Sequence, residues 1–251
     1  MAEHLLHSVI LFAIGTIAAF LNVNAGGGST LTVPALIFLG LDAATANGTN
    51  RIAILLQNVS AVRSFQKEKY SQFKLSWKLS LLAVPGAVIG ALTAVEISDQ
   101  LFKNILAVVM IGIIITILFP GKKNTTTEDS EDKKLTLPVI LSFIFVGFYG
   151  GIIQVGIGFI LMAILQKLMK FSLVYVNMHK VFIVLVFTVP ALMVFILSGK
   201  VNWYLGLSLA LGNMFGAWWA AKLSIKKGEK FIKVILVIAI LIMSVKLLNI
   251  F

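Results

Sequence analysis

The fold of this chain is constrained most by a succession of long apolar segments that only short polar stretches separate. Hydrophobic residues make up 59% of the 251 positions and charged residues only 12%, with a mean hydropathy of +1.00. A soluble globule of this size needs more polar surface than that. Since a backbone embedded in lipid must pair its own polar groups, the segments are expected to be helices. The sequence therefore predicts an all-α, polytopic integral membrane protein.

Ten apolar segments are predicted, covering residues 5–21, 29–40, 44–62, 77–95, 101–119, 135–149, 152–168, 172–197, 203–223 and 231–251. The second is too short to cross a bilayer comfortably. If the segments next to the glycine-rich breaks form re-entrant hairpins, eight spans remain, so we expect eight to ten membrane segments. Residues 121–134 are polar and carry charges of both signs, which predicts a linker. It would join an N-terminal transmembrane repeat, 1–120, to a C-terminal one, 135–251.

A run of three glycines interrupts the apolar sequence at positions 26–28. Each glycine destabilises a helix by roughly 1 kcal/mol relative to alanine, so a helix that begins near Leu5 should open there. The opened backbone must be buried in protein or line a polar cavity. The hydroxyl residues that follow suit the start of a short helix, whose free N–H groups would face the gap. The candidate binding residues of this stretch are Asn24, Gly26, Gly27, Gly28, Ser29 and Thr30.

The two halves of the chain share ordered landmarks. A shift of 130 positions places Asn24, Gly26, Gly28 and Asn47 on Gln154, Gly156, Gly158 and Asn177. A shift of 126 positions places Gly86 and Gly90 on Gly212 and Gly216, and such glycine pairs favour close helix packing. Weak internal similarity of this kind is typical of transporter repeats, although chance coincidence among abundant glycines is the alternative.

Most of the basic residues fall into four polar stretches, 63–78, 122–134, 167–170 and 222–230. The positive-inside rule places all four in the cytoplasm, and it explains the net charge of +11 without a nucleic-acid partner. The first half of the chain then starts outside and the second half inside. The repeats are therefore expected to have inverted topology, with a substrate site near the membrane midplane. The candidate binding residues at the second glycine break are Gln154, Gly156 and Gly158.

Two cations lie inside apolar segments. Arg51 and Lys180 are each about eight residues from the start of a segment, or roughly 12 Å at 1.5 Å per residue. A cation near the midplane costs at least about 2.5 kcal/mol, so it needs a partner. Neither segment contains a carboxylate beyond Asp42 at a helix end. An anionic substrate is the simplest partner, and the alternative is that the cations snorkel or meet backbone carbonyls at the helix breaks.

Polar neighbours accompany the two cations, and residues three or four apart share a helix face. They could donate to an oxyanion or simply hydrogen-bond between helices. The histidine among them could carry a proton or act as a fixed donor. A pairing of Ser29 with His179 as nucleophile and base has no further motif in support, so no enzyme activity, metal site or cofactor is expected. The candidate residues of this group are Asn47, Thr49, Asn50 and Arg51, with Asn177, His179 and Lys180.

Two motifs resemble those of a known family. The stretch Gly26-Gly27-Gly28-Ser29, followed by Val33-Pro34-Ala35-Leu36 and Ala46-Asn47-Gly48-Thr49-Asn50, is similar to the first signature of the TauE/SafE sulfite exporter family. Gly147-Phe148-Tyr149-Gly150-Gly151 through Gly156-Ile157-Gly158-Phe159 resembles the second signature. The resemblance covers nearly the whole chain. At Ile157 the family usually has a third glycine, which predicts a less open second half-site.

The resemblance implies a multi-pass permease of the bacterial inner membrane that moves sulfite or organosulfur anions such as sulfoacetate, usually outward. The residues themselves suggest alternating access around Arg51 and Lys180. An anion channel, or a carrier of another small carboxylate or inorganic anion, is the alternative. The expected partners are the small anion and the lipid bilayer, and the sequence leaves room for a homodimer.

Overall fold

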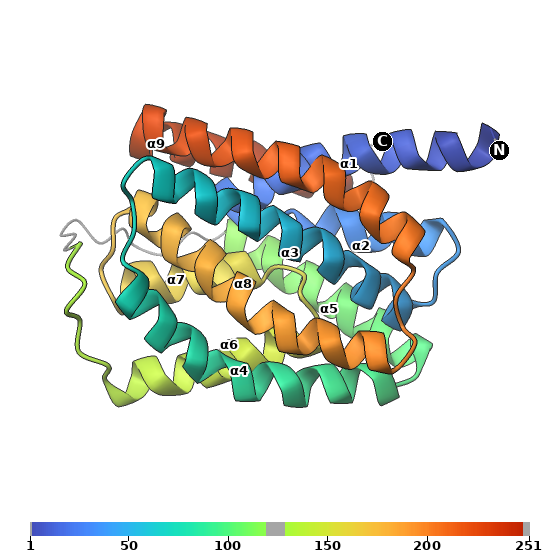
Figure 1. The fold of residues 1–251 in the computed structure, drawn as a ribbon, viewed down its shortest axis with the longest axis horizontal. Coiled ribbons are helices and arrows are strands. Elements are labelled where there is room, and N and C mark those ends of the chain that lie inside the picture. Colours follow the sequence, from blue (N-terminus) through green and yellow to red (C-terminus); the bar gives the residue numbers. More distant parts are fainter. Residues whose placement is uncertain (1, 119–128, 248–251) are drawn as a thin grey trace.

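The computed structural model describes residues 2–118 and 129–247, and every regular element in these ranges is a helix (Figure 1). The helices are α1 (Ala2–Ala25), α2 (Ser29–Phe38), α3 (Ala43–Lys67), α4 (Phe73–Glu96), α5 (Asp99–Leu118), α6 (Leu137–Ile152), α7 (Ile157–Lys167), α8 (Leu173–Leu197) and α9 (Trp203–Leu247). Three of these described helices contain spans long and apolar enough to cross a membrane, namely Leu6–Asn24 in α1, α4 and α8. The all-α prediction is confirmed.

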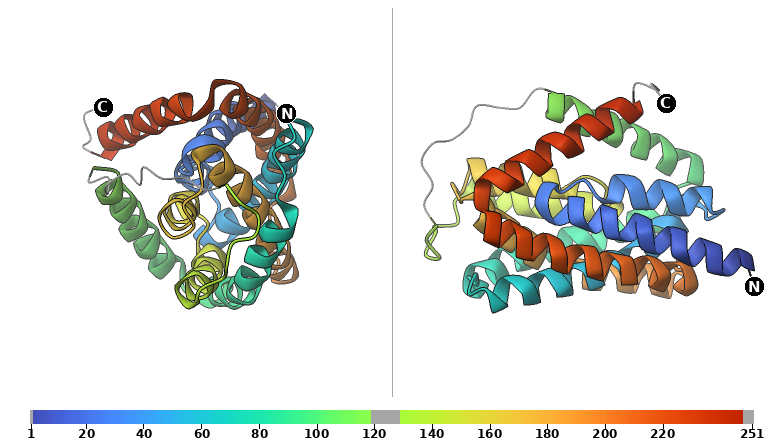
Figure 2. Two further views of the ribbon diagram at one scale, coloured as in Figure 1. Left: turned by 90° about the vertical axis from the view of Figure 1, so that its left-hand side faces the viewer. Right: turned by 90° about the horizontal axis from the view of Figure 1, so that it is seen from above.

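The helices form one bundle in which α3 and α8 lie at the centre. Helix α1 packs along α9, and α4 packs along α6. Helix α3 contacts α8 and α9, while α8 also contacts α4 (Figures 1 and 2). Many of the buried polar side chains belong to α3 and α8. In a protein whose outer surface is apolar, these two helices therefore gather polar groups in the interior.

Glycine pairs allow the outer helices to approach closely. A Cβ atom added at Gly86 would lie 2.4 Å from the carbonyl oxygen of Ile144, so only glycine fits between α4 and α6. Likewise, a Cβ atom at Gly212 or Gly216 would lie 2.1 Å from a carbonyl oxygen of α1. The close packing predicted from these glycine pairs is confirmed.

The last two predicted segments, 203–223 and 231–251, belong to one continuous helix, so the expected interruption between them is wrong. Lysine and glutamate dominate residues 224–230, and they favour a helix enough to carry it past Gly228. Figure 2 shows that α9 changes direction, so that its second part folds back toward α5. Positions 248–251 lie outside the described residues.

The connections lie at two opposite ends of the bundle (Figure 1). The N-terminal part of α1 and the connections 39–42, 97–98 and 198–202 share one end. The connections 68–72 and 168–172 and the bend of α9 share the other, which is the end with most of the basic residues. Within the predicted linker, positions 121–128 lie outside the described residues, and 129–134 form no helix.

Candidate functional site

Two interruptions of the helical backbone meet at the centre of the bundle. Helix α1 ends at Ala25 and α2 begins at Ser29, while α6 ends at Ile152 and α7 begins at Ile157. Gly26 (φ +88°) and Gly156 (φ +77°) adopt the left-handed conformation that glycine tolerates best. A Cβ atom at Gly26 would lie 2.5 Å from the carbonyl carbon of Gly158. The two interruptions therefore touch backbone to backbone, which leaves no room for a side chain.

Helix α3 caps the end of α6. The last carbonyls of a helix have no intrahelical partner. Asn47 Nδ2 donates to the Ile152 carbonyl at 2.9 Å, and Arg51 Nη2 donates to the carbonyls of Gly150, at 3.0 Å, and Gly151. The Arg51 guanidinium is fully buried, with its Cζ 4.7 Å from the ring centroid of Phe195. Arg51 Nε and Nη1 have no hydrogen-bond partner in the described part of the chain.

Helix α8 caps the end of α1 in the same manner. Lys180 Nζ donates to the carbonyls of Asn22 at 3.1 Å and Val23 at 2.8 Å, and to Asn177 Oδ1 at 2.9 Å. An ammonium group has three donors, so all three are used. Each buried cation thus holds the interrupted first helix of the other half of the chain. Both cations thus meet backbone carbonyls at the helix breaks, which is one of the alternatives that the sequence leaves open.

A small cavity lies beside the second of these caps. Space for the centre of a water molecule amounts to about 10 Å³, roughly what one water needs. Among its described lining residues there is one cation and no carboxylate. Near the first interruption, the polar groups are one amide from α1 and one hydroxyl from α2. Two amides from α3, one amide from the second interruption and the ammonium group from α8 complete the polar lining. The lining residues are Asn22, Ser29, Ile54, Gln57, Asn58, Gln154, Ile157, Gly158, Lys180, Val181 and Val184.

Four residues predicted from the sequence line this cavity, namely Ser29, Gln154, Gly158 and Lys180. The others lie in the two interruptions and in α1, α2, α3 and α8. Arg51 is directed at the carbonyls of α6, and its contact with an anion stays a prediction. The predicted residues outside the lining set are Asn24, Gly26, Gly27, Gly28, Thr30, Asn47, Thr49, Asn50, Arg51, Gly156, Asn177 and His179.

Several of these outlying residues hold local structure. Thr30 Oγ1 donates to the Gly27 carbonyl at 2.6 Å, and Asn24 Nδ2 donates to the Phe20 carbonyl at 3.0 Å. Thr49 Oγ1 accepts from the backbone N–H of Asn202, which ties α3 to the start of α9. Such contacts fix the backbone on which the cavity is built.

His179 contacts neither Ser29 nor the cavity. Its Nδ1 lies 2.8 Å from Ser76 Oγ, and its Nε2 lies 3.0 Å from Gln72 Oε1, which can only accept. The ring is therefore fixed as an Nε2–H donor between α8 and the start of α4. No group of three or more His, Asp or Glu side chains within 2–118 and 129–247 is arranged to hold a metal ion.

Sequence reasoning missed Asn22, Gln57 and Asn58 as lining residues. Gln57 Oε1 accepts from Asn22 Nδ2 and from Asn213 Nδ2, each at 3.3 Å. The signal that could have found Gln57 and Asn58 is their position seven residues after Asn50 and Arg51. Seven residues are about two helical turns, so Gln57 and Asn58 lie on the same face of α3 as the polar pair seven residues before them.

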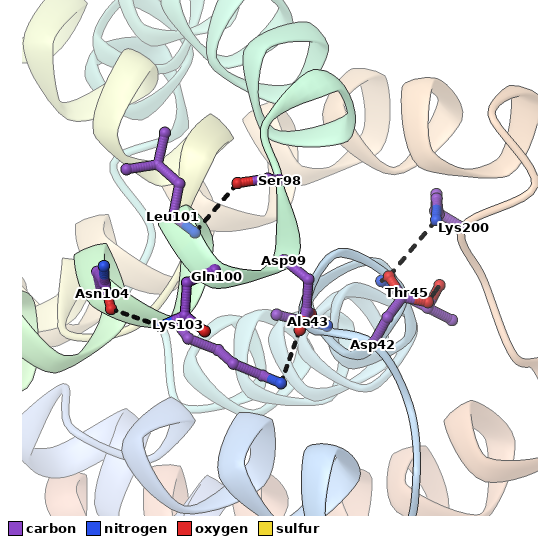
Figure 3. Close-up of polar contacts among 10 residues, drawn as sticks. All are labelled: Asp42, Ala43, Thr45, Ser98, Asp99, Gln100, Leu101, Lys103, Asn104 and Lys200. Carbon is purple, nitrogen blue, oxygen red and sulfur yellow. Dashed lines mark hydrogen bonds and ion pairs between the residues drawn. The ribbon is translucent and has the colours of Figure 1, made fainter.

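A polar cluster fixes the start of α3 (Figure 3). It lies at the end of the bundle opposite to the one that carries most of the basic residues. Asp42 accepts from Thr45 N at 3.1 Å and Thr45 Oγ1 at 2.6 Å, and Lys200 Nζ lies 3.5 Å from Asp42 Oδ1. Burial alone would raise the pKa of Asp42, but the hydrogen bonds from Thr45 and the charge of Lys200 hold that pKa below its ordinary value.

Asp99 completes this cluster from the first turn of α5. Its carboxylate pairs with Lys103 at 2.6 Å and accepts from the Ala43 N–H at 2.6 Å (Figure 3). The contact with Lys103, followed by that with Ala43, lowers the pKa of Asp99. Two carboxylates thus lie at the positive end of the α3 dipole, where they stabilise the helix that carries Arg51.

Comparison with known proteins gives a consistent result. The sequence model of the family described as sulfite exporter TauE/SafE matches residues 11–247. The probable membrane transporter protein ORF9 of a Sinorhizobium species is 31% identical over 249 residues, covering 99% of this chain and 94% of that protein. The probable membrane transporter protein YfcA of Escherichia coli K12 is 30% identical over 243 residues, covering 95% and 88%. No solved structure matches the chain significantly.

The family match spans nearly the whole chain and includes the two interruptions, the buried cations and the residues that line the cavity. The relatives align over almost their full length as well. On this evidence, the chain belongs to the TauE/SafE sulfite exporter family of membrane transporters.

Proposed function

We propose that the protein exports sulfite or an organosulfonate-type anion, such as sulfoacetate, by alternating access around the central cavity. The observation that carries this proposal is the ammonium of Lys180 at the wall of a buried cavity that is otherwise lined by amides, a hydroxyl and apolar groups. The oxygens of a sulfite or sulfonate group would accept hydrogen bonds from these donors. An inside-negative potential would favour export of an anion by about 2.3 kcal/mol per charge per 100 mV.

The contacts of Lys180 suggest how binding is coupled to movement. All three of its N–H donors are engaged by the carbonyls of Asn22 and Val23 and by Asn177. An incoming oxyanion would replace at least one of these acceptors. Because two of the three are carbonyls at the end of α1, an anion that replaces either of them would loosen that end. The cavity holds about one water, so it must widen to admit the anion.

We further propose that the chain crosses the bacterial inner membrane several times as two inverted repeats, with the linker in the cytoplasm. Two features of the packing support this topology. The contact of α1 with α9 matches that of α6 with α4, and the contact of α3 with α9 matches that of α8 with α4. The caps formed by Arg51 and Lys180 are exchanged between the halves in the same manner. Most basic residues gather at one end, as the positive-inside rule requires of a cytoplasmic face.

The small size of the cavity, with space for about one water, supports a carrier over an anion channel, which needs a continuous conducting path. A cavity with one cation would also accept a small carboxylate or an inorganic anion. Competition among anions in proteoliposomes of the purified protein tests the substrate class. We expect saturable uptake of labelled sulfite or sulfoacetate that the other sulfur anion inhibits and acetate does not. Equal inhibition by acetate would reject the sulfur specificity, and unsaturable electrical conductance would reject the carrier.

A further inference from the structure

Near its bend, α9 carries a groove on its outward face. The described residues that line it are Phe215, Trp218, Trp219, Lys222, Leu223 and Lys226, and its volume is about 430 Å³. These positions are spaced by one, three or four residues, so they follow one face of the helix. The groove is separate from the central cavity, since the two share no lining residue.

The chemistry of the groove changes along the helix. Three aromatic rings lie at its inner part, and each is about half exposed, at 45–50%. Two lysines, one helical turn apart, follow at the part nearer the bend. The Lys222 ammonium lies 5.1 Å from the ring centroid of Trp218, so the charge stays beside the aromatic surface. The groove thus has an apolar floor of aromatic rings and two positively charged lysines at one end.

The aromatic floor is held in place by α1. The Trp219 ring lies 5.2 Å from that of Phe20, and the Phe215 ring lies 6.5 Å from that of Phe12, centroid to centroid. Rings that are packed on one side and exposed on the other lose little freedom when a ligand covers them. The surface is therefore ordered before anything binds.

The position of the groove fits a lipid better than a soluble ligand. Lys222 and Lys226 follow the three aromatic residues along α9 and belong to the basic stretch 222–230. Figure 2 shows that α9 bends at the end of the bundle where its first part stops. A phospholipid presents the same order of chemistry, with a phosphate at the membrane surface and acyl chains below it. Tryptophan rings suit that boundary, and lysines near it attract anionic headgroups.

We propose that this groove is a binding site for one anionic phospholipid. The headgroup phosphate lies between Lys222 and Lys226, and an acyl chain covers Phe215, Trp218 and Trp219. The site is separate from the transport cavity, so lipid binding and anion binding are measured independently. A zwitterionic lipid offers the same chains without net charge, and it binds more weakly.

Native mass spectrometry of the purified protein, exposed to phosphatidylglycerol or phosphatidylcholine, tests the proposal. We expect the wild-type protein to retain one phosphatidylglycerol in preference to phosphatidylcholine. The pair Lys222→Gln and Lys226→Gln should weaken phosphatidylglycerol binding about tenfold or more, since each surface lysine contributes about 1 kcal/mol to anionic-lipid attraction. The pair Lys222→Arg and Lys226→Arg should preserve it.

The matched control is the pair Lys74→Gln and Lys78→Gln, which removes the same charge from exposed positions of α4 at the same end of the bundle. This pair should bind phosphatidylglycerol like the wild type. The absence of lipid preference in the wild-type protein would overturn the proposal even if the glutamine pair failed to fold. Equal losses in the two glutamine pairs, displacement of the lipid by inorganic phosphate, or a groove that instead holds a second copy of the chain would overturn it too.

Discussion

Arg51 and Lys180 make equivalent contacts on opposite halves of the molecule. Each projects from a central helix and donates to two carbonyls at the end of the interrupted helix of the other half. They differ in their access to the cavity, because Lys180 lines it and Arg51 does not. This difference suggests a division of roles, in which Arg51 mainly holds the fold and Lys180 also meets the anion.

Replacing Arg51 by glutamine should lower stability more than it lowers anion affinity. The carbonyls of Gly150 and Gly151 would lose their charged donor, and an unpaired buried group costs about 1–3 kcal/mol. The loss is measured as a shift in thermal unfolding of the protein in detergent. Arg63→Gln, at an exposed position of the same helix, is the control and should change stability by less than about 0.5 kcal/mol. Equal stability of the Arg51 and Arg63 variants would refute the capping role.

Gly26→Ala should destabilise the contact between the two interruptions. The new Cβ atom would lie 2.5 Å from the Gly158 carbonyl carbon, and the residue would keep a positive φ. Gly40→Ala separates these effects, because Gly40 also has a positive φ but a Cβ atom there meets nothing within 4 Å. We expect Gly26→Ala to cost about 2 kcal/mol more than Gly40→Ala, as overpacked sites do. Unfolding temperatures that match within error would contradict the backbone contact.

The cluster at the start of α3 predicts a loss of stability in acid. The pKa values of Asp42 and Asp99 are lower in the folded protein than their ordinary value of 3.8. Their carboxylates therefore stabilise the fold above about pH 4, and this contribution is lost as the pH falls through the folded-state values. The pair Asp42→Asn and Asp99→Asn should flatten the dependence of unfolding temperature on pH between about 5 and 3. Glu96→Gln, an exposed change outside the cluster, should leave that dependence unaltered.

The end of the linker should matter for stability as well. Asp129 Oδ1 accepts from the Ser172 N–H at 2.8 Å, and Glu131 Oε1 accepts from the Lys74 N–H at 3.0 Å, so one short segment caps α8 and α4. Glu131→Ala should cost about 0.5–2 kcal/mol, as the loss of a helix cap does. The exposed neighbour Asp132 offers a control, and Asp132→Ala should be nearly neutral. A Glu131 variant as stable as the Asp132 variant would show that the cap contributes nothing.

The sequence predicted the apolar helices and the glycine contacts because local composition decides them. Ser29 begins α2 and the glycine pairs of α4 and α9 pack closely, as expected. Backbone carbonyls at the helix breaks were only one alternative for the partners of Arg51 and Lys180, because such carbonyls, here about 100 and 157 positions away, can come from any residue. Gln57 was missed because its spacing from Asn50 gives only a shared helix face, and the cavity that Gln57 lines forms only when the helices pack together. The continuity of α9 was missed because charged residues resemble a loop yet favour a helix.

The role of Lys180 in anion binding is tested most directly by measuring sulfite and sulfoacetate affinity, by calorimetry, in the wild-type protein and in Lys180→Gln and Lys180→Arg variants. We expect the glutamine variant to bind at least about tenfold more weakly, since a charged hydrogen bond contributes about 1.5–3 kcal/mol. The arginine variant should retain measurable binding, and Lys200→Gln, at the outer polar cluster, should bind like the wild type. Unchanged affinity in a folded Lys180→Gln protein would contradict the proposed site.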